Sequence, residues 1–282
     1  MSNVAVVTDS TAYIPEELVR SHQINVIPQV LIWGDQTYRD GIDIQPDDFY
    51  QRLKKTTVMP STSQATIGSF KTIFQTLHAQ GKDILAVLLA ASLSGTMDSA
   101  IQARRELPEA CIELVDSGTA AMALGFVALQ AARAAQQGAG IEECKRIAQE
   151  GAKHVGVFFA VDTLEFLHRG GRIGGGTRFL GTALNIKPIL ELKNGRVEAV
   201  ERVRTRKKSL ARLIELVEER VQGKRPVRLA VLHANAPDEA HELLEQAQAR
   251  LGAEDKVFSS VSPVVGTHTG PGTVGLAYMA GF

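Results

Sequence analysis

Three apolar, strand-like runs in this chain each end in a turn rich in hydroxyl groups, and a helical pattern follows each turn. The runs occupy residues 4–7, 84–89 and 112–115. Short apolar strands that alternate with helices predict βαβ units and a mainly parallel sheet. In such a sheet the carboxyl ends of the strands meet at one edge, where ligands usually bind. We therefore expect an α/β fold with a ligand site at that edge.

The turns themselves carry neutral hydrogen-bonding groups. Ser10, Ser94 and Ser117 follow the three strands, and a fourth hydroxyl cluster at residues 61–64 follows Pro60. A serine between a strand and a helix commonly caps the helix, which stabilises it by about 1 kcal/mol. The same helix ends expose N–H groups that attract anions. The turns are therefore suited to holding a carboxylate or phosphate more than to breaking a bond.

A break in the pattern divides the chain into two expected domains. Gly138-Ala139-Gly140 interrupts the alternation before a short helix. We expect an N-terminal domain of residues 1–153, with a mainly parallel βαβ sheet and helices on both faces. Residues 154–282 are expected to form a C-terminal domain with a mixed α/β sheet, which includes a hairpin turning at Asn194-Gly195 and a terminal loop over residues 267–272.

Composition argues against several functional classes. Lys+Arg and Asp+Glu both number 31, and aromatic residues are 5% of the chain, which argues against a nucleic-acid coat or a base-stacking platform. The two cysteines, Cys111 and Cys144, are far apart and fit a reducing compartment. The first residues do not resemble a signal peptide, and the longest mostly apolar stretch, 120–132, is too short to span a bilayer. We expect a soluble cytoplasmic protein.

Two motif matches fail on their context. Gly270-x-Gly272-x-x-Gly275 imitates a dinucleotide fingerprint, but seven residues after Gly275 leave no room for the required βαβ unit. His241-Glu242-Leu243-Leu244-Glu245 approaches a zinc-binding helix but ends in glutamate. The sequence predicts neither a cofactor nor a metal.

Two further features are candidates for binding. His268 lies between two threonines and before Gly-Pro-Gly, a setting that fits a ligand contact, a hydrogen-bond relay or a structural histidine. Residues 202–208 hold five bases, and so dense a patch can dock an acidic partner or a phosphate. Arg172, in the glycine-rich loop 170–176, is expected to face this patch. The five bases are Arg202, Arg204, Arg206, Lys207 and Lys208.

Seven short motifs, in order along essentially the whole chain, resemble those of the DegV family of bacterial fatty-acid-binding proteins. They are Thr8-Asp9-Ser10-Thr11, Thr62-Ser63-Gln64, Leu93-Ser94-Gly95-Thr96, Val115-Asp116-Ser117, Gly170-Gly171-Arg172-Ile173, Asn185-Ile186-Lys187-Pro188 and Thr267-His268-x-Gly270-Pro271-Gly272. Each motif is weak alone, but the ordered set is specific.

The resemblance implies a two-domain α/β protein that holds one long-chain fatty acid in a tunnel and has no catalytic residues of its own. Thr62 and Ser94 match the residues that hold the carboxylate, and the family's histidine, matching His268, lies nearby. Some members present the fatty acid to a separate kinase, which makes an acyl phosphate for phospholipid synthesis. Four further candidates for the site are Ser63, Ser10, Ser117 and Gly95. Candidates for contact with a kinase are Arg172, Arg204, Arg206 and Lys207.

The chain departs from the family pattern at three places. Ala90-Ala91 stand where the family often has two serines, Ala65 replaces a usual proline and Met97 a frequent aromatic residue. These changes leave the preference for fatty acid chain length open.

Two other functions also remain: an acyl hydrolase or transferase that uses Ser94 and His268, and a regulatory anion-binding module that uses the patch at 202–208.

Overall fold

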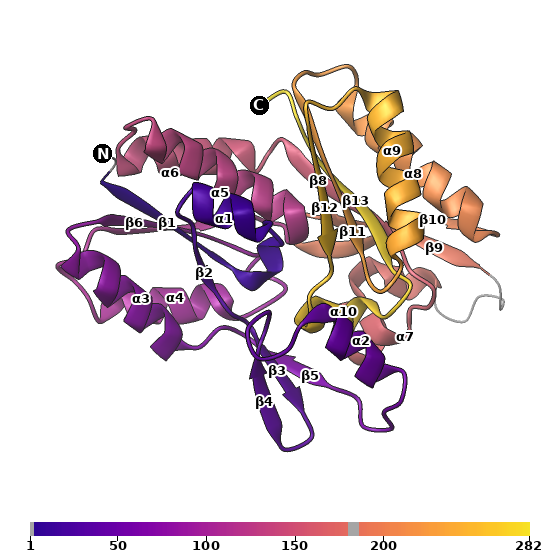
Figure 1. Cartoon of the computed structure of the whole chain (residues 1–282), viewed down its shortest axis with the longest axis horizontal. Coiled ribbons are helices and arrows are strands. Elements are labelled where there is room, and N and C mark those ends of the chain that lie inside the picture. The colour runs from indigo at the N-terminus through magenta and orange to yellow at the C-terminus, as the bar shows by residue number, and fades with distance from the viewer. Residues whose placement is uncertain (1–2, 180–185) are drawn as a thin grey trace.

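Two large sheets and one small sheet form the framework of the molecule (Figure 1). The structure, a computed structural model, describes residues 3–179 and 186–282, so Asn185 of the predicted motifs lies outside the described residues. The first large sheet comes from the first half of the chain and the second from the second half. Helix α5 (Ala121–Gln136) contacts strands of both, so the two sheets share one layer of helix.

The first sheet has the strand order β2-β1-β6-β7, and every neighbouring pair is parallel. Its strands are β1 (Val4–Asp9), β2 (Asn25–Ile27), β6 (Asp83–Leu88) and β7 (Ile112–Asp116). Alternate residues face opposite sides: Val6 packs in the cluster that contains α5, whereas Val7 packs with the opposite helices. Helices α5 and α6 (Ile141–Gly151) cover one face, and α3 (Ile67–Ala79) and α4 (Thr96–Arg105) cover the other. The predicted parallel sheet with helices on both faces is confirmed.

The second sheet is mixed, as predicted. Its order is β10-β9-β8-β13-β11-β12, in which only β11 and β12 are parallel neighbours. The predicted hairpin turns at Asn194 and Gly195, both with positive φ, as a two-residue turn requires. The strands are β8 (Val155–Ala160), β9 (Lys187–Lys193), β10 (Arg196–Val203), β11 (Val227–His233), β12 (Asp255–Ser260) and β13 (Val274–Ala280). Helices α8 (Arg206–Val221) and α9 (Pro237–Leu251) cover the face opposite α5.

A small antiparallel sheet from the first half of the chain contacts a helix from the second half. Its order is β4-β3-β5, with β3 (Val30–Trp33), β4 (Gln36–Arg39) and β5 (Ser61–Ser63). The short helix α10 (Pro263–Thr269), from the end of the chain, packs on β5, β3 and α2 (Pro46–Leu53). The remaining elements are η1 (Ser10–Ala12), α1 (Glu16–Ser21), α7 (Glu165–Arg169) and η2 (Gly174–Phe179). The predicted boundary at 153/154 falls between α6 and β8 and stays a prediction.

One expectation for the C-terminal segment was wrong. Residues 267–272 were expected to form a loop, but Thr267, His268 and Thr269 are the last turn of α10. Pro263 stands at the first position of this helix, where its fixed φ and missing N–H are tolerated. Only Gly270-Pro271-Gly272 forms the turn that follows.

Within the described residues, no helix is both long enough and apolar enough to cross a bilayer.

Candidate functional site

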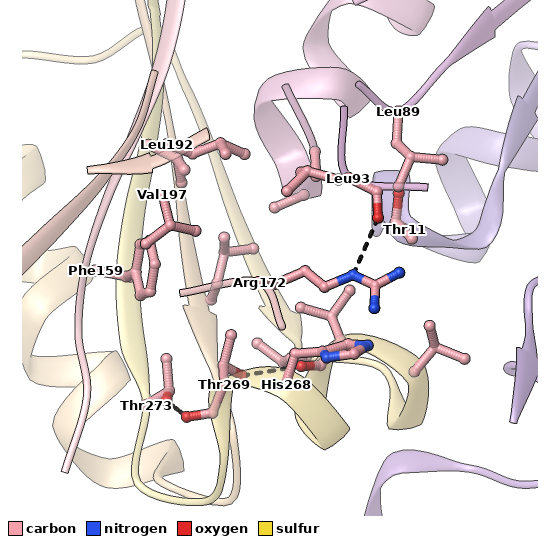
Figure 2. A pocket seen from close by; sticks show the side chains of 18 of the residues that line it. Thr11, Leu89, Leu93, Phe159, Arg172, Leu192, Val197, His268, Thr269 and Thr273 are labelled. Carbon is pink, nitrogen blue, oxygen red and sulfur yellow. Dashed lines mark hydrogen bonds between the residues drawn. The ribbon is translucent and has the colours of Figure 1, made fainter. Parts of the chain in front are cut away.

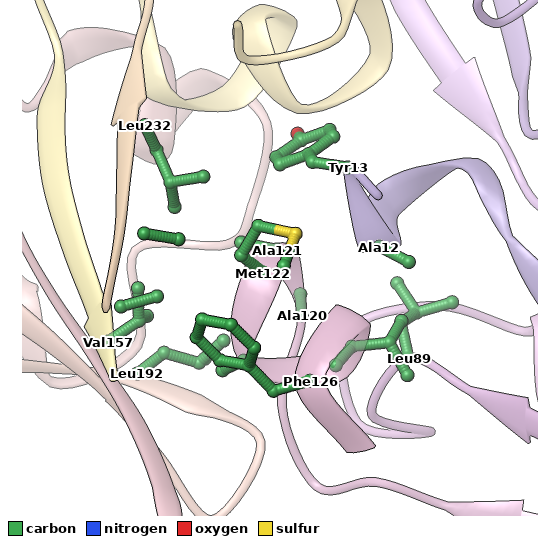
Figure 3. Packing of buried hydrophobic residues seen from close by; sticks show 14 of the residues in the cluster. Ala12, Tyr13, Leu89, Ala120, Ala121, Met122, Phe126, Val157, Leu192 and Leu232 are labelled. Carbon is green, nitrogen blue, oxygen red and sulfur yellow. The ribbon is translucent and has the colours of Figure 1, made fainter. Parts of the chain in front are cut away.

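A cavity lies between the two halves, and segments far apart in the sequence line it (Figure 2). Centres of water molecules could occupy about 140 Å³ of it, roughly ten times what a single water needs. Its walls are mainly apolar and include Leu89, Ala120, Val157, Phe159, Leu192 and Val197. Figure 3 shows Ala120 and Ala121, at the start of α5, between Leu89 of the first half and Val157 and Leu192 of the second. Small residues at this point leave room that larger side chains would fill.

Thr62 and His268, two of the predicted head-group residues, meet at this cavity. Thr62 comes from β5 and His268 from the last turn of α10, which packs against β5. Thr62 Oγ1 and His268 Nε2 are 2.8 Å apart and share a hydrogen bond across 206 residues of sequence. His268 Nδ1 is buried and has no hydrogen-bond partner among the described residues. The pair therefore retains hydrogen-bonding capacity for a ligand.

Ser94, the third predicted residue, lines the same cavity at the beginning of α4. Its Oγ accepts a hydrogen bond from the Thr96 N–H at 3.3 Å and lies 2.9 Å from Thr96 Oγ1. The hydroxyl thus bonds to the first residue of α4. The N-cap residue of α4 is Gly95, without a side-chain cap, so the expected capping role of Ser94 was wrong. The Ser94 side chain lines the cavity.

Gln29 lines the cavity and was missed by sequence reasoning. Its side chain is 2% exposed, and its Oε1 accepts hydrogen bonds from the Ala65 N–H at 2.9 Å and Thr96 Oγ1 at 3.0 Å. The amide nitrogen has no hydrogen-bond partner among the described residues, although its proximity helps stabilise the buried Asp9 carboxylate. The sequence feature that could have identified Gln29 is its position as a polar residue inside the mostly apolar run 24–33.

His268 is neutral at physiological pH. Burial, together with the nearby positive charge of Arg172, lowers the pKa of His268 from 6.5 to about 4. A neutral imidazole offers one donor and one acceptor, so this end of the cavity is polar without a charge on the histidine.

This pKa predicts acid sensitivity. Because the folded pKa lies below the unfolded one, the unfolded chain takes up the proton first as the pH falls from 6.5 towards 4, and folding stability falls with it. Between pH 7 and pH 5 the loss attributable to His268 is about 2 kcal/mol. Denaturant unfolding of the parent and of His268→Gln at both pH values measures it. An NMR titration midpoint of the ring near 6.5 in the folded protein would contradict the prediction.

Arg172 is part of the cavity wall, although it was expected to face the basic patch. Its Nε donates to the Leu93 carbonyl at 3.2 Å and one Nη donates to the Gly170 carbonyl at 2.8 Å. Figure 2 shows the side chain reaching towards Leu93. Arg172 thus links the loop after α7 to the loop that carries Ser94.

The four further site candidates do not line this cavity. Ser10 Oγ donates a hydrogen bond to Asp40, and Ser117 Oγ donates one to the Thr119 carbonyl. Both hydroxyls therefore hydrogen-bond to neighbouring protein groups. Ser63 and Gly95 line a separate polar pocket between the starts of α3 and α4. A binding role for these four residues stays a prediction.

Four of the five bases of the predicted patch are exposed, including Arg202 and Lys208, and Arg206 is the exception. Arg204 and Lys207 are exposed. The Arg206 side chain is only 17% exposed, pairs with Glu239 at 2.8 Å and donates to the Gly272 carbonyl at 2.6 Å. Arg206 therefore holds α8 to α9 and to the turn after α10, where a partner has little access to it.

A buried carboxylate anchors the helix that carries His268. Asp40, 1% exposed, accepts a hydrogen bond from Ser10 Oγ at 2.7 Å and another from the Val264 N–H, in the first turn of α10, at 3.1 Å. Burial raises the pKa of Asp40, and these hydrogen bonds oppose that rise. A residue of the first half thus holds the start of a helix from the second half.

Comparisons with known proteins agree with this architecture. The family model described as "Uncharacterised protein, DegV family" matches residues 3–281. A DegV domain-containing protein of Streptomyces coelicolor is 41% identical, with 97% of each chain covered. A solved structure of a DegV family protein from Thermus thermophilus, described as fatty acid binding, is similar, with a TM-score of 0.93 and 32% sequence identity over 99% of this chain and 100% of that one. The structure of DegV from Bacillus subtilis, described as a fatty acid binding protein, is also similar, with a TM-score of 0.89 and 36% identity over 99% of this chain and 100% of that one. From the match along its length and these relatives, this chain belongs to the DegV family.

Proposed function

We propose that this protein binds one long-chain fatty acid in the cavity, with the acyl chain against the apolar wall and the carboxylate at Thr62, Ser94 and His268. The observation that carries the proposal is an apolar cavity whose polar lining residues are all neutral except Arg172, and in which the buried His268 Nδ1 has no hydrogen-bond partner among the described residues. Relatives of similar structure are named as fatty-acid-binding proteins.

The acyl chain supplies most of the affinity. Burial of about a dozen methylenes at ~0.8 kcal/mol each gives a gross gain on the order of 10 kcal/mol. Association removes several kcal/mol of that gain. Each hydrogen bond to the carboxylate adds about 1.5–3 kcal/mol before the cost of desolvation. The hydroxyls therefore mainly orient the head group, and the apolar wall retains the ligand.

The second part of the proposal is that the protein, in the cytoplasm, presents the bound carboxylate to a separate kinase. A carboxylate oxygen would bond to the terminal phosphorus of a nucleoside triphosphate, and the nucleoside diphosphate would leave. The product is an acyl phosphate, an activated acyl donor for phospholipid synthesis. Arg172 at the cavity and the exposed Arg204 and Lys207 support this part, because they could attract an acidic partner.

The geometry favours a carrier over a hydrolase. A serine nucleophile needs a base within hydrogen-bond reach, whereas Ser94 Oγ pairs with Thr96 and His268 Nε2 pairs with Thr62. Turnover of an activated acyl ester that Ser94→Ala abolishes would reverse this preference. Salt-sensitive binding of nucleic acid would instead favour the anion-binding module.

Native mass spectrometry of the purified protein, followed by solvent extraction, tests the proposal directly. We expect one acid per chain, identified by the mass difference and by its extracted form. The delipidated protein should take up one equivalent of a long-chain fatty acid and gain thermal stability, since a ligand that binds only the folded state stabilises it. No co-purifying acid combined with no uptake would exclude the function.

A further inference from the structure

Three side chains beside the cavity, Gln29, Thr96 and Ser94, form a hydrogen-bonded series, here called the Ser94 network. Gln29 Oε1 lies 3.0 Å from Thr96 Oγ1, which in turn lies 2.9 Å from Ser94 Oγ. Gln29 and Thr96 are buried, so the bond between them is shielded from bulk water. Gln29 and Ser94 also line the cavity. The Ser94 network therefore connects a buried amide to the proposed head-group site.

The Ala65 N–H fixes the direction of the bonds in the Ser94 network. A backbone N–H can only donate, so the atom that it contacts at 2.9 Å is the oxygen of the Gln29 amide. An amide oxygen can only accept, so Thr96 Oγ1 donates to it. The single hydroxyl proton of Thr96 is then committed, and Ser94 must donate the bond between the two hydroxyls. The Ser94 proton therefore points to Thr96.

Ser94 Oγ consequently has an accepting position left for a ligand. Its proton lies towards Thr96, and one of its two lone pairs accepts from the Thr96 N–H at 3.3 Å. A head group that donates a hydrogen bond can use the second lone pair without any rearrangement. A carboxylate can only accept, so it bonds to Ser94 only after the Ser94 O–H turns away from Thr96. Thr96 Oγ1 then loses the hydrogen bond that it accepts.

Other hydroxyls that line the cavity also have committed protons. Thr11 Oγ1 donates to the Asp9 carboxylate at 2.6 Å. Thr269 and Thr273 donate to main-chain carbonyl oxygens at 3.2 and 2.8 Å. Like Ser94, these hydroxyls have their protons bonded to the protein and present lone pairs to other groups.

The donors at the head-group end come from Thr62, His268 and Arg172. The Thr62 hydroxyl and the neutral His268 ring carry two protons, and their mutual bond uses one, so one remains for a ligand. Arg172 has further N–H groups beyond the two that its carbonyl contacts use. A head group with one accepting and one donating atom thus matches these donors together with the Ser94 oxygen.

We propose that Gln29 is a specificity-determining residue, which holds Ser94 in its accepting state and thereby adds long-chain primary amides to the ligands of the cavity. This inference rests on the proposed function, because it places the head group at Thr62 and Ser94. The amide oxygen accepts from the donors at Thr62, His268 and Arg172, and the amide N–H donates to Ser94. A fatty acid loses this match when it ionises. Gln29 thus reduces the preference of the cavity for a carboxylate.

The test compares three ligands of equal chain length on the delipidated full-length protein at neutral pH. They are the fatty acid, the primary amide R–CONH₂ and the methyl ketone R–CO–CH₃, and displacement of a fluorescent fatty acid gives each affinity. The amide and the ketone have nearly the same shape, but only the amide donates. We expect the parent to bind the amide about fivefold more tightly than the ketone, the effect of one neutral hydrogen bond. Ser94→Ala removes the acceptor and should abolish this advantage.

Gln29→Met and Thr96→Val should release the Ser94 proton by different routes. Methionine has a volume similar to that of glutamine but lacks the accepting oxygen, whereas valine removes the Thr96 hydroxyl itself. In both variants Ser94 can donate to a carboxylate without breaking the Ser94 network. The ratio of acid to amide affinity should therefore rise roughly three- to tenfold. The ratio cancels any loss of affinity that both ligands share. Gln29→Glu retains the accepting oxygen and, as the matched control, should give no rise.

An unchanged or lower ratio of acid to amide affinity in either variant would overturn the role of Gln29 while fatty acid binding stands. Equal binding of amide and ketone by the parent would overturn it as well, and so would a raised ratio in Gln29→Glu. If the parent does not bind the fatty acid, the proposed function fails first, so the two failures are distinguishable.

Discussion

Ala120→Phe is expected to lower the affinity for a long-chain fatty acid roughly two-hundredfold while the protein stays folded. Ala120 lines the cavity and has an extended backbone before α5, a conformation that an aromatic residue adopts easily. A phenyl ring there displaces about four methylenes of the ligand, which at ~0.8 kcal/mol each costs about 3 kcal/mol. The ring fills existing space, so the empty protein should lose little stability or gain some.

A series of increasingly large apolar residues at Ala120 tests whether cavity space limits the length of the bound acid. Ala120→Val, Ala120→Leu and Ala120→Phe should restrict the protein to progressively shorter acids, measured by competition between acids of different length. Ala79→Phe, at the exposed end of α3, is the matched control and should bind like the parent. Parent-like affinity in Ala120→Phe would show that the acyl chain lies elsewhere.

Removal of the two head-group hydroxyls is expected to have the second largest effect. Thr62→Val and Ser94→Ala each delete one donor at the cavity, and each should weaken retention about tenfold, since a hydrogen bond to a charged group contributes about 1.5–3 kcal/mol before desolvation. The protein should remain folded because Val matches the shape of Thr, and Ser94→Ala loses only the two hydrogen bonds between Ser94 Oγ and Thr96. A ¹³C-carboxyl-labelled fatty acid should show a broadened or shifted carboxylate signal.

Ser63→Ala is the control for this pair, because Ser63 neighbours Thr62 on β5 but does not line the cavity. It should retain the ligand like the parent. Transfer of the acyl group to a kinase should fall in Thr62→Val and Ser94→Ala. If both variants transfer as well as the parent does, the head-group assignment is wrong.

The sequence predicted those parts of the fold that local chemistry determines. The apolar runs at residues 4–7, 84–89 and 112–115 have their turns and helices beside them, so each βαβ unit is visible in a short window. The Asn194-Gly195 hairpin is likewise encoded by two residues that tolerate positive φ. The parallel first sheet and the mixed second sheet follow from these local signals.

The missed parts depend on contacts between distant residues. β5 is three residues long and exists because it pairs with β3, and α10 is one short helix whose start is held by Asp40, 224 residues away in sequence. Gln29 looks like an interruption of a strand until Ala65 and Thr96 are seen to donate to it. No local pattern carries such information. The meeting of Thr62 and His268 could be expected only through the resemblance to a family.

The contact between Asp40 and α10 means that the proposed head-group site depends on both halves of the chain. A cut between α6 and β8 would leave Thr62 and Ser94 on one fragment and His268 on the other, with the anchor of the histidine's helix on the wrong piece. Neither fragment would contain all three residues of the proposed head-group site. Under the proposed function, ligand binding therefore requires that the whole chain be synthesised and folded.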